Sequence, residues 1–175
     1  MRWLAACVLT LLIGGCEEKV RPAVAPVAQA EVAAQESWNS TVRFSDSARV
    51  KALLWAGHIR VFSDQQTTTL DESLHVDFFN EREEHTSVLT ARRGKVNDRT
   101  RDFEAHENVI VISDSGTTLR TERLFWDNAT RRIRTDAFVD IVSPTEHIMG
   151  HGMESDQSLR NYRIFRVTGQ RTTYE

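Results

Sequence analysis

Cys16 is the residue whose type and position suit it best for a covalent reaction. It directly follows Gly14 and Gly15, and a short apolar run at residues 3–13 precedes them, with a positive start at Arg2. These features are typical of a signal peptide. The four residues IGGC resemble a lipobox, in which cleavage leaves the cysteine first and its thiol carries diacylglycerol. An ordinary signal peptide with a chance cysteine is the alternative.

The leader and the composition of the residues after it predict how the chain is divided. The signal peptide should cover residues 1–15, because its apolar run is shorter than the about 20 residues that a transmembrane helix needs. Residues 16–40 are rich in Glu, Ala, Val, Gln and Pro without a periodic apolar face, which predicts a lipidated cysteine followed by a flexible tether. A short helix at residues 28–36 is the alternative. One folded domain is expected at residues 41–175.

Other reactive groups do not form a recognisable catalytic pattern. The sequence contains no nucleophile elbow, P-loop, dinucleotide fingerprint or H-E-x-x-H motif. His147 and His151 are four residues apart, which in a strand or a turn does not bring two imidazoles together as metal ligands. We therefore expect no enzyme activity, no cofactor and no metal site.

Composition narrows the class of protein further. Hydrophobic residues make up 40% and charged residues 27% of the 175 residues, which excludes a disordered tail protein and a multi-span membrane protein. The formal charge is −3, and loss of Arg2 with the leader would make it −4, so nucleic acid is not an expected partner. The two cysteines, Cys7 and Cys16, both fall outside the expected domain, which must rest on its hydrophobic core.

From residue 50 onward, apolar residues recur at every second position, which predicts strands. Polar residues lie between them, so each strand should have one dry face and one wet face, as in antiparallel sheets. In one of these segments the odd positions Leu53, Trp55, Ile59 and Val61 are apolar. The run at residues 109–112 is apolar throughout, which favours a strand covered on both faces, and a change of phase between residues 119 and 126 favours a β-bulge or a bend.

An internal repeat organises these strands. Asp98, Asp127 and Asp156 are each 29 residues apart (127 − 98 and 156 − 127), and each is followed by a bulky residue and an apolar strand. We interpret the aspartates as turn caps in equivalent hairpins. Because one hairpin cannot bury its apolar face alone, neighbouring hairpins must stack. The result should be a folded-over sheet with an apolar interior.

Several runs carry a family resemblance, and their order and spacing are more specific than any one of them. They are LRTERLFWDN at residues 119–128, IRTD at 133–136, VDI at 139–141 and IMGHGMESD at 148–156. Together they resemble the LptC family, the periplasmic components of the lipopolysaccharide export machine, and the related OstA-like domains. The similarity covers residues 44–169. Well-known members keep a transmembrane helix, whereas this chain resembles variants with a lipid anchor.

The resemblance implies a V-shaped antiparallel β-jellyroll whose interior carries lipid A acyl chains. It also implies non-enzymatic transfer of lipopolysaccharide, accepted from the inner-membrane ABC transporter complex and passed to a periplasmic bridge protein of the OstA-like family. The expected location is the periplasmic face of the inner membrane, held by the lipid anchor, with the outer membrane as the alternative. The alternative function is a structural outer-membrane lipoprotein that binds protein or peptidoglycan.

Candidate site residues follow from the alternation and the resemblance together. The last strand should offer a free edge to the bridge protein, with Tyr162, Ile164 and Val167 on it. Two groups of cations, at residues 92–101 and 131–134, are interpreted either as solvated strand faces or as contacts to lipid A phosphates. The candidates for the lipid groove share an expected inward direction, and they are Trp55, Phe78, Phe103, Val111, Leu119, Ile133, Val139, Ile148 and Tyr162.

Overall fold

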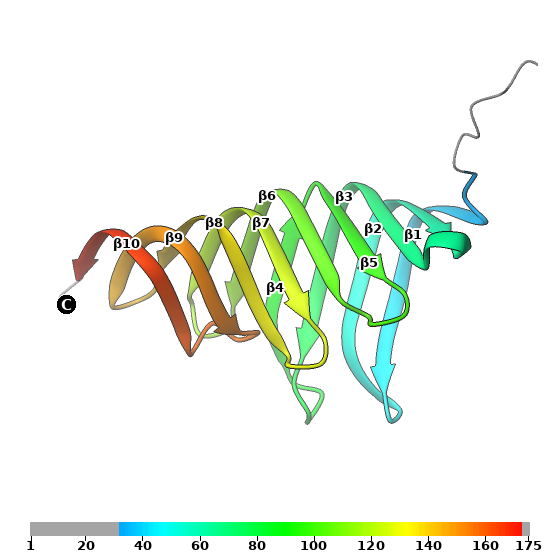
Figure 1. Ribbon diagram of the computed structural model, residues 1–175. Helices are drawn as coiled ribbons and strands as arrows, with labels where there is room; N and C mark the ends of the chain where they lie inside the picture. The colour runs from blue at the N-terminus through cyan, green and yellow to red at the C-terminus, as the bar shows by residue number, and fades with distance from the viewer. Residues whose placement is uncertain (1–31, 173–175) are drawn as a thin grey trace, which may run out of the picture. The chain divides into compact units, whose positions relative to one another are not determined.

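The computed structural model describes residues 32–172, which form one antiparallel sheet of ten strands with the chain running back and forth across it (Figure 1). The strand order is β1-β2-β3-β4-β6-β7-β8-β9-β10, and β5 pairs with β3 and β6. No α-helix occurs in these residues. The predicted all-β class and the antiparallel β-jellyroll are therefore confirmed. The strands are β1 (Gln35–Asp46), β2 (Arg49–Phe62), β3 (Thr67–Phe79), β4 (His85–Ala91), β5 (Arg93–Asn97), β6 (Phe103–Ser113), β7 (Thr118–Asp127), β8 (Arg132–Val142), β9 (Glu146–Asp156) and β10 (Tyr162–Thr172).

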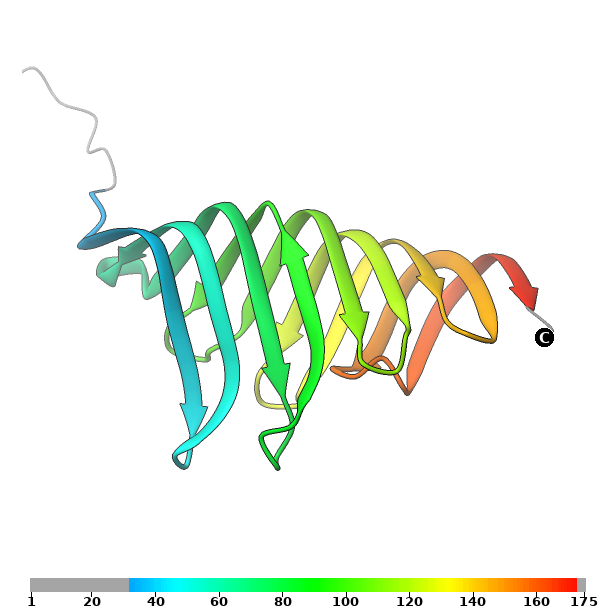
Figure 2. The same cartoon turned by 180° about the vertical axis from the view of Figure 1, so that it is seen from behind.

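Most of the long strands bend near their middle, so that the sheet folds over itself, as Figure 1 and Figure 2 show from opposite sides. Irregular positions mark the bends. In β3 the left-handed residues are Glu72 and Ser73, and in β6 they are Glu107 and Asn108. The pairing of β7 with β8 shifts between Thr121 and Phe125, which confirms the predicted phase change. Each bulge increases the local twist and lets one strand serve both layers.

Apolar side chains line the inner surface of the fold. In β3 the buried residues Leu74, Val76 and Phe78 alternate with more exposed ones, as the sequence predicts. In β6 Val109 and Val111 are buried, but Ile112 is 51% exposed on the outer surface. The prediction that this run is covered on both faces is therefore wrong. The outward side chains of this run stay exposed, because within residues 32–172 no second layer packs on the outer surface of this antiparallel sheet.

Trp55 lies on the outer surface, so its predicted inward direction is wrong. The inward residues of the first part of β2 are the even ones, Leu54 and Ala56, whereas Ile59 is buried after the register shift between Ala56 and His58. A bulge adds one residue and so exchanges the two faces of the strand. The bulge sits at Gly57, where a Cβ would collide with the backbone of Glu72.

The first strand begins earlier than the sequence suggested. Strand β1 starts at Gln35, five positions before the predicted end of the tether at residue 40. It is held by its ladder with β2 and by Trp38, whose ring stacks on His58 with 4.9 Å between centroids. The predicted signal peptide, Cys16 and most of the tether fall outside the described residues, and so do residues 28–31 of the alternative helix. The other five residues of that alternative, 32–36, are not helical. Its last two residues, 35 and 36, lie in strand β1.

Side-chain oxygens cap three equivalent turns, though not always those of the predicted aspartates. Asp127 accepts a hydrogen bond from the Thr130 amide at 2.8 Å, and this bond lowers the pKa of Asp127. In the preceding repeat Asn97, not Asp98, accepts the amides of Arg99 and Thr100. Asn and Asp cap such turns equally well. The regular spacing of the aspartates therefore predicted Asp98, whereas the capping residue is Asn97, one position earlier.

Asp156 caps the third turn most extensively. It accepts hydrogen bonds from the amides of Ser158 and Arg160, both at 3.1 Å, and from the Asn161 side chain at 2.7 Å. Burial alone would raise the pKa of Asp156, but these donors together lower it. A carboxyl with a lowered folded-state pKa stabilises the fold above its unfolded value of about 3.9 and loses that contribution as the pH falls through the folded value. The carboxylate therefore fixes this turn at neutral pH.

Candidate functional site

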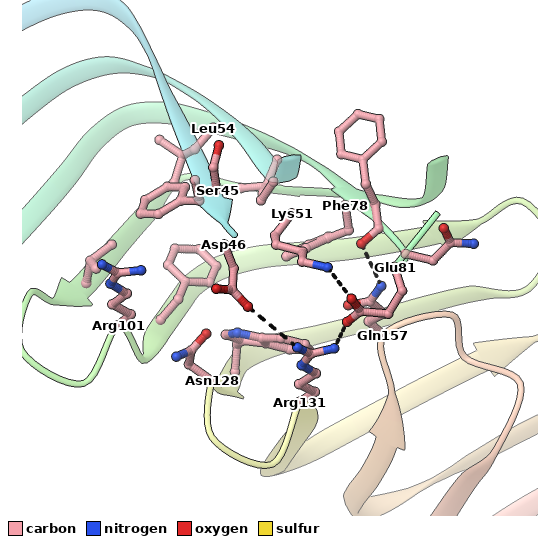
Figure 3. Close-up of a pocket in the computed structure, with 18 of the residues that line it drawn as sticks. Ser45, Asp46, Lys51, Leu54, Phe78, Glu81, Arg101, Asn128, Arg131 and Gln157 are labelled. Carbon is pink, nitrogen blue, oxygen red and sulfur yellow. Dashed lines mark hydrogen bonds and ion pairs between the residues drawn. The ribbon is translucent and has the colours of Figure 1, made fainter. Parts of the chain in front are cut away.

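The interior of the folded sheet opens at one rim into a pocket of about 540 Å³ (Figure 3). Its rim is formed by the β1–β2, β3–β4, β5–β6 and β7–β8 turns together with the β9–β10 turn. The pocket is thus built from turns that are distant in the sequence. Its lining residues are Phe44, Ser45, Asp46, Lys51, Ala52, Leu54, Val76, Phe78, Phe79, Asn80, Glu81, Val96, Arg101, Phe103, Trp126, Asn128, Arg131, Asp156 and Gln157.

The floor of the pocket is apolar and aromatic. Alternation in β2 and β3 brings Leu54 and Val76 opposite each other, and Phe78 opposite Ala52. Trp126 at the end of β7 lies against Phe78, with 5.9 Å between ring centroids. Strands β3 and β7 are not neighbours in the sheet, so the fold-over brings Phe78 and Trp126 together. Such a floor can bury alkyl groups and offers them no strong polar partner.

The rim carries charged groups that pair across the opening. The Lys51 ammonium lies 2.6 Å from the Glu81 carboxylate, and the Arg131 guanidinium pairs with the same carboxylate. Arg131 also lies 4.0 Å from Asp46. Because β8 is not a sheet neighbour of β1 or β3, Arg131 connects two separate parts of the rim. Figure 3 shows this chain of ion pairs over the pocket.

On one side of the pocket, the β9–β10 turn packs across the interior of the folded sheet. The Gln157 amide donates hydrogen bonds to the Phe79 carbonyl at 3.2 Å and to the Thr86 hydroxyl at 3.4 Å. The Ser87 hydroxyl donates to the Gln157 carbonyl at 2.9 Å. Leu159 in the same turn is only 1% exposed and belongs to the core. The interior is therefore open under the first strands and closed further along the sheet.

The predicted groove residues do not all lie at the pocket. Phe78 and Phe103 line the pocket. Trp55 lies on the outer surface and is 37% exposed, and Tyr162 is half-buried against the core. Those buried in the closed region or away from the pocket are Val111, Leu119, Ile133, Val139 and Ile148.

Sequence reasoning missed several pocket residues. Phe44 lies near the predicted start of the domain, and Leu54 has the opposite parity to the residues predicted to point inward. Val96 and Trp126 stand at strand ends next to turns, where alternation gives a weak signal. The clearest usable signal was Gly57, because glycine inside a strand often marks a bulge.

Strand β10 forms one edge of the sheet and pairs only with β9. Tyr162 and Ile164 pack against the core, while Val167 is 54% exposed. The Tyr162 hydroxyl donates to Glu146 at 2.6 Å, and burial followed by this hydrogen bond raises its pKa to about 12. All three predicted edge residues therefore lie on a strand whose outer side is free in the described part of the chain.

Two histidines near this edge each contact a different neighbouring side chain. His147 lies 2.6 Å from Asp140, and His151 packs edge-on against Phe138. Between residues 32 and 172, no three His, Cys, Asp or Glu side chains are grouped so that they could hold a metal ion. The same residues contain no helix with the length and hydrophobicity to cross a membrane.

Comparison with known proteins identifies the family. No curated protein matches the sequence significantly. The family described as "Lipopolysaccharide-assembly, LptC-related" matches residues 3–175. Its members are transport components, which agrees with a chain that offers a cavity and a free sheet edge. The chain therefore belongs to the LptC family, which acts in lipopolysaccharide transport on the periplasmic side of the inner membrane.

Proposed function

We propose that this protein is a passive carrier that holds lipopolysaccharide acyl chains in the pocket under its first strands. The lipid would be accepted from the inner-membrane ABC transporter and passed to a periplasmic bridge protein of the OstA-like family. The protein would perform no chemical step, and the transporter would supply the free energy and the direction. The observation that carries the proposal is the open apolar pocket lined by Phe44, Phe78 and Trp126.

The energetics favour alkyl chains as the occupant. Each methylene that leaves water contributes about 0.8 kcal/mol, and an acyl chain brings many of them. The pocket floor gives such a chain aromatic contacts and removes water from it. A small polar molecule would gain less there, because the polar groups lie only at the rim.

Photo-crosslinking in cells tests the carrier function. A photoreactive amino acid replacing Phe78 should form an adduct with lipopolysaccharide, because this side chain faces the pocket. The same amino acid at Trp55, on the outer surface of the adjacent strand, is the matched control and should give no adduct. Equal labelling at both positions, or no labelling at Phe78, would count against the pocket as the lipid site.

We further propose that Cys16 anchors the protein to the inner membrane. The IGGC run and the apolar leader support this anchor, and two or three acyl chains bind a bilayer far more firmly than one. Incorporation of a radioactive fatty acid into the chain, and its loss in Cys16→Ser, would test the proposal. Recovery of the unlabelled variant in the soluble periplasmic fraction is the expected companion result.

The sheet has two edge strands, β1 and β10, and each could dock a different partner. The pocket opens under the strands next to edge β1, and edge β10 lies at the other end of the strand order. An exposed edge can extend into another sheet by backbone pairing. We propose that the transporter lies on the β1 side and that the bridge protein adds to β10 at Tyr162, Ile164 and Val167.

A further inference from the structure

We propose that Arg101, Arg131 and Lys51 form a phosphate-binding subsite at the rim of the pocket. This inference rests on the proposed function, because the phosphates would belong to the headgroup of a lipid whose chains enter the pocket. All three cations line the same cavity as the apolar floor. The pocket would then bind an amphiphile by both of its ends, with alkyl groups inside and anions at the rim.

The two arginines occupy equivalent places in the hairpin repeat. Arg101 and Arg131 each lie two residues before an inward residue, Phe103 and Ile133 respectively. Both have left-handed backbone conformations, with φ of 62° and 56°. Glycine or asparagine is favoured in this region, because the Cβ atom of other residues comes too close to the backbone carbonyl oxygen. The shared conformation therefore places the two arginines alike in their turns.

The neighbouring cations do not share this arrangement. Arg93 pairs with Glu107 and Arg123 pairs with Asp136, both away from the pocket. Arg99 lies in the same turn as Arg101, and Arg132 directly follows Arg131 as the first residue of β8, but neither lines the cavity. Of the two cation groups in the sequence, only Arg101 and Arg131 therefore reach the pocket.

The ion pairs at the rim are suited to exchange. Lys51 and Arg131 share the Glu81 carboxylate, and the Glu81 and Arg131 side chains are more than half exposed. Exposed pairs contribute little to stability, so another anion can replace the carboxylate at small cost. Arg101 has no carboxylate within 4.0 Å among residues 32–172. A phosphate carries several acceptor oxygens and can engage guanidinium groups in a bidentate manner.

In this arrangement the Glu81 carboxylate occupies the position that a phosphate of the ligand would take. It holds Lys51 and Arg131 over the rim when no lipid is bound, and it competes with phosphate when lipid arrives. The arginines and Glu81 should therefore affect binding in opposite directions. A merely structural closure of the rim would make loss of Arg131 and loss of Glu81 act in the same direction, because each breaks the same ion pair.

Binding of detergent-solubilised lipid A to the full chain tests the subsite. Lipid A with two phosphates should bind about tenfold more weakly to Arg101→Ala and to Arg131→Ala, since each loses a charge-assisted contact. Arg99→Ala and Arg132→Ala are the matched controls and should bind as the unchanged chain does. Dephosphorylated lipid A should bind equally to all five proteins. Glu81→Gln should bind the phosphorylated lipid more tightly.

The outcomes separate this subsite from the carrier function. Unchanged binding of the phosphorylated lipid by both rim variants would overturn the subsite, and so would weaker binding by Glu81→Gln. Absence of binding by either lipid would instead overturn the proposed carrier function. Inorganic phosphate at the same molar concentration as lipid should not compete. Full competition would show that the rim takes free phosphate and would overturn the headgroup assignment. Thermal unfolding of each variant verifies that it is folded.

Discussion

Ala52→Trp is expected to block lipid binding while the protein still folds. Ala52 lies between Phe44 and Phe78 in the strand register, and its methyl group lines the pocket. An indole at this position would occupy space that acyl chains need. Excluding even two methylenes costs about 1.6 kcal/mol, which corresponds to more than a tenfold loss of affinity. Crosslinking of lipopolysaccharide from position 78 measures the effect.

The matched control places the same side chain on the other face of the same strand. Leu53 alternates with Ala52, so Leu53→Trp adds an indole outside the pocket. This variant should retain crosslinking, and both variants should show the far-ultraviolet circular dichroism of the unchanged sheet. If a folded Ala52→Trp still crosslinks as strongly as the unchanged chain, the acyl chains lie elsewhere.

Proline in β10 is expected to abolish docking of the bridge protein at one of two adjacent positions. Arg163 pairs with Glu154 and Ile164 with Met153 in a regular antiparallel register. Successive amides of an edge strand point alternately toward the neighbouring strand and outward. Proline is tolerated on an edge only where its missing amide faces outward. One of Arg163→Pro and Ile164→Pro should therefore keep the fold and lose at least tenfold in affinity for the bridge protein.

The second variant of the pair serves as the internal control. It removes an amide that bonds to β9, so it should lower the thermal unfolding temperature and leave the outward amide in place. A pull-down with the purified bridge protein and a thermal melt measure both effects. If the variant that keeps its melting temperature also keeps its affinity, docking does not use the backbone of β10.

The sequence by itself determined the class of fold and the family. Strict alternation in segments such as residues 74–78 and 133–141 can be satisfied only by strands with one buried face, because the side-chain period of a strand is two. The repeated hairpins required stacking, since none could bury its apolar face alone. The spacing of the four matching runs was then sufficient to indicate the LptC family, which the family match confirms.

Only the tertiary structure decided which side chains line the pocket. A single bulge at Gly57 exchanges the faces of β2, so Leu54 points inward and Trp55 outward. The alternation of apolar and polar residues does not reveal such a shift, because it shows the periodicity of a strand but not its register with the neighbouring strands. The pairing of Arg131 with Glu81 depends on the fold-over of the whole sheet, which brings together turns that are 50 residues apart. Long-range contacts of this kind leave no local pattern in the chain.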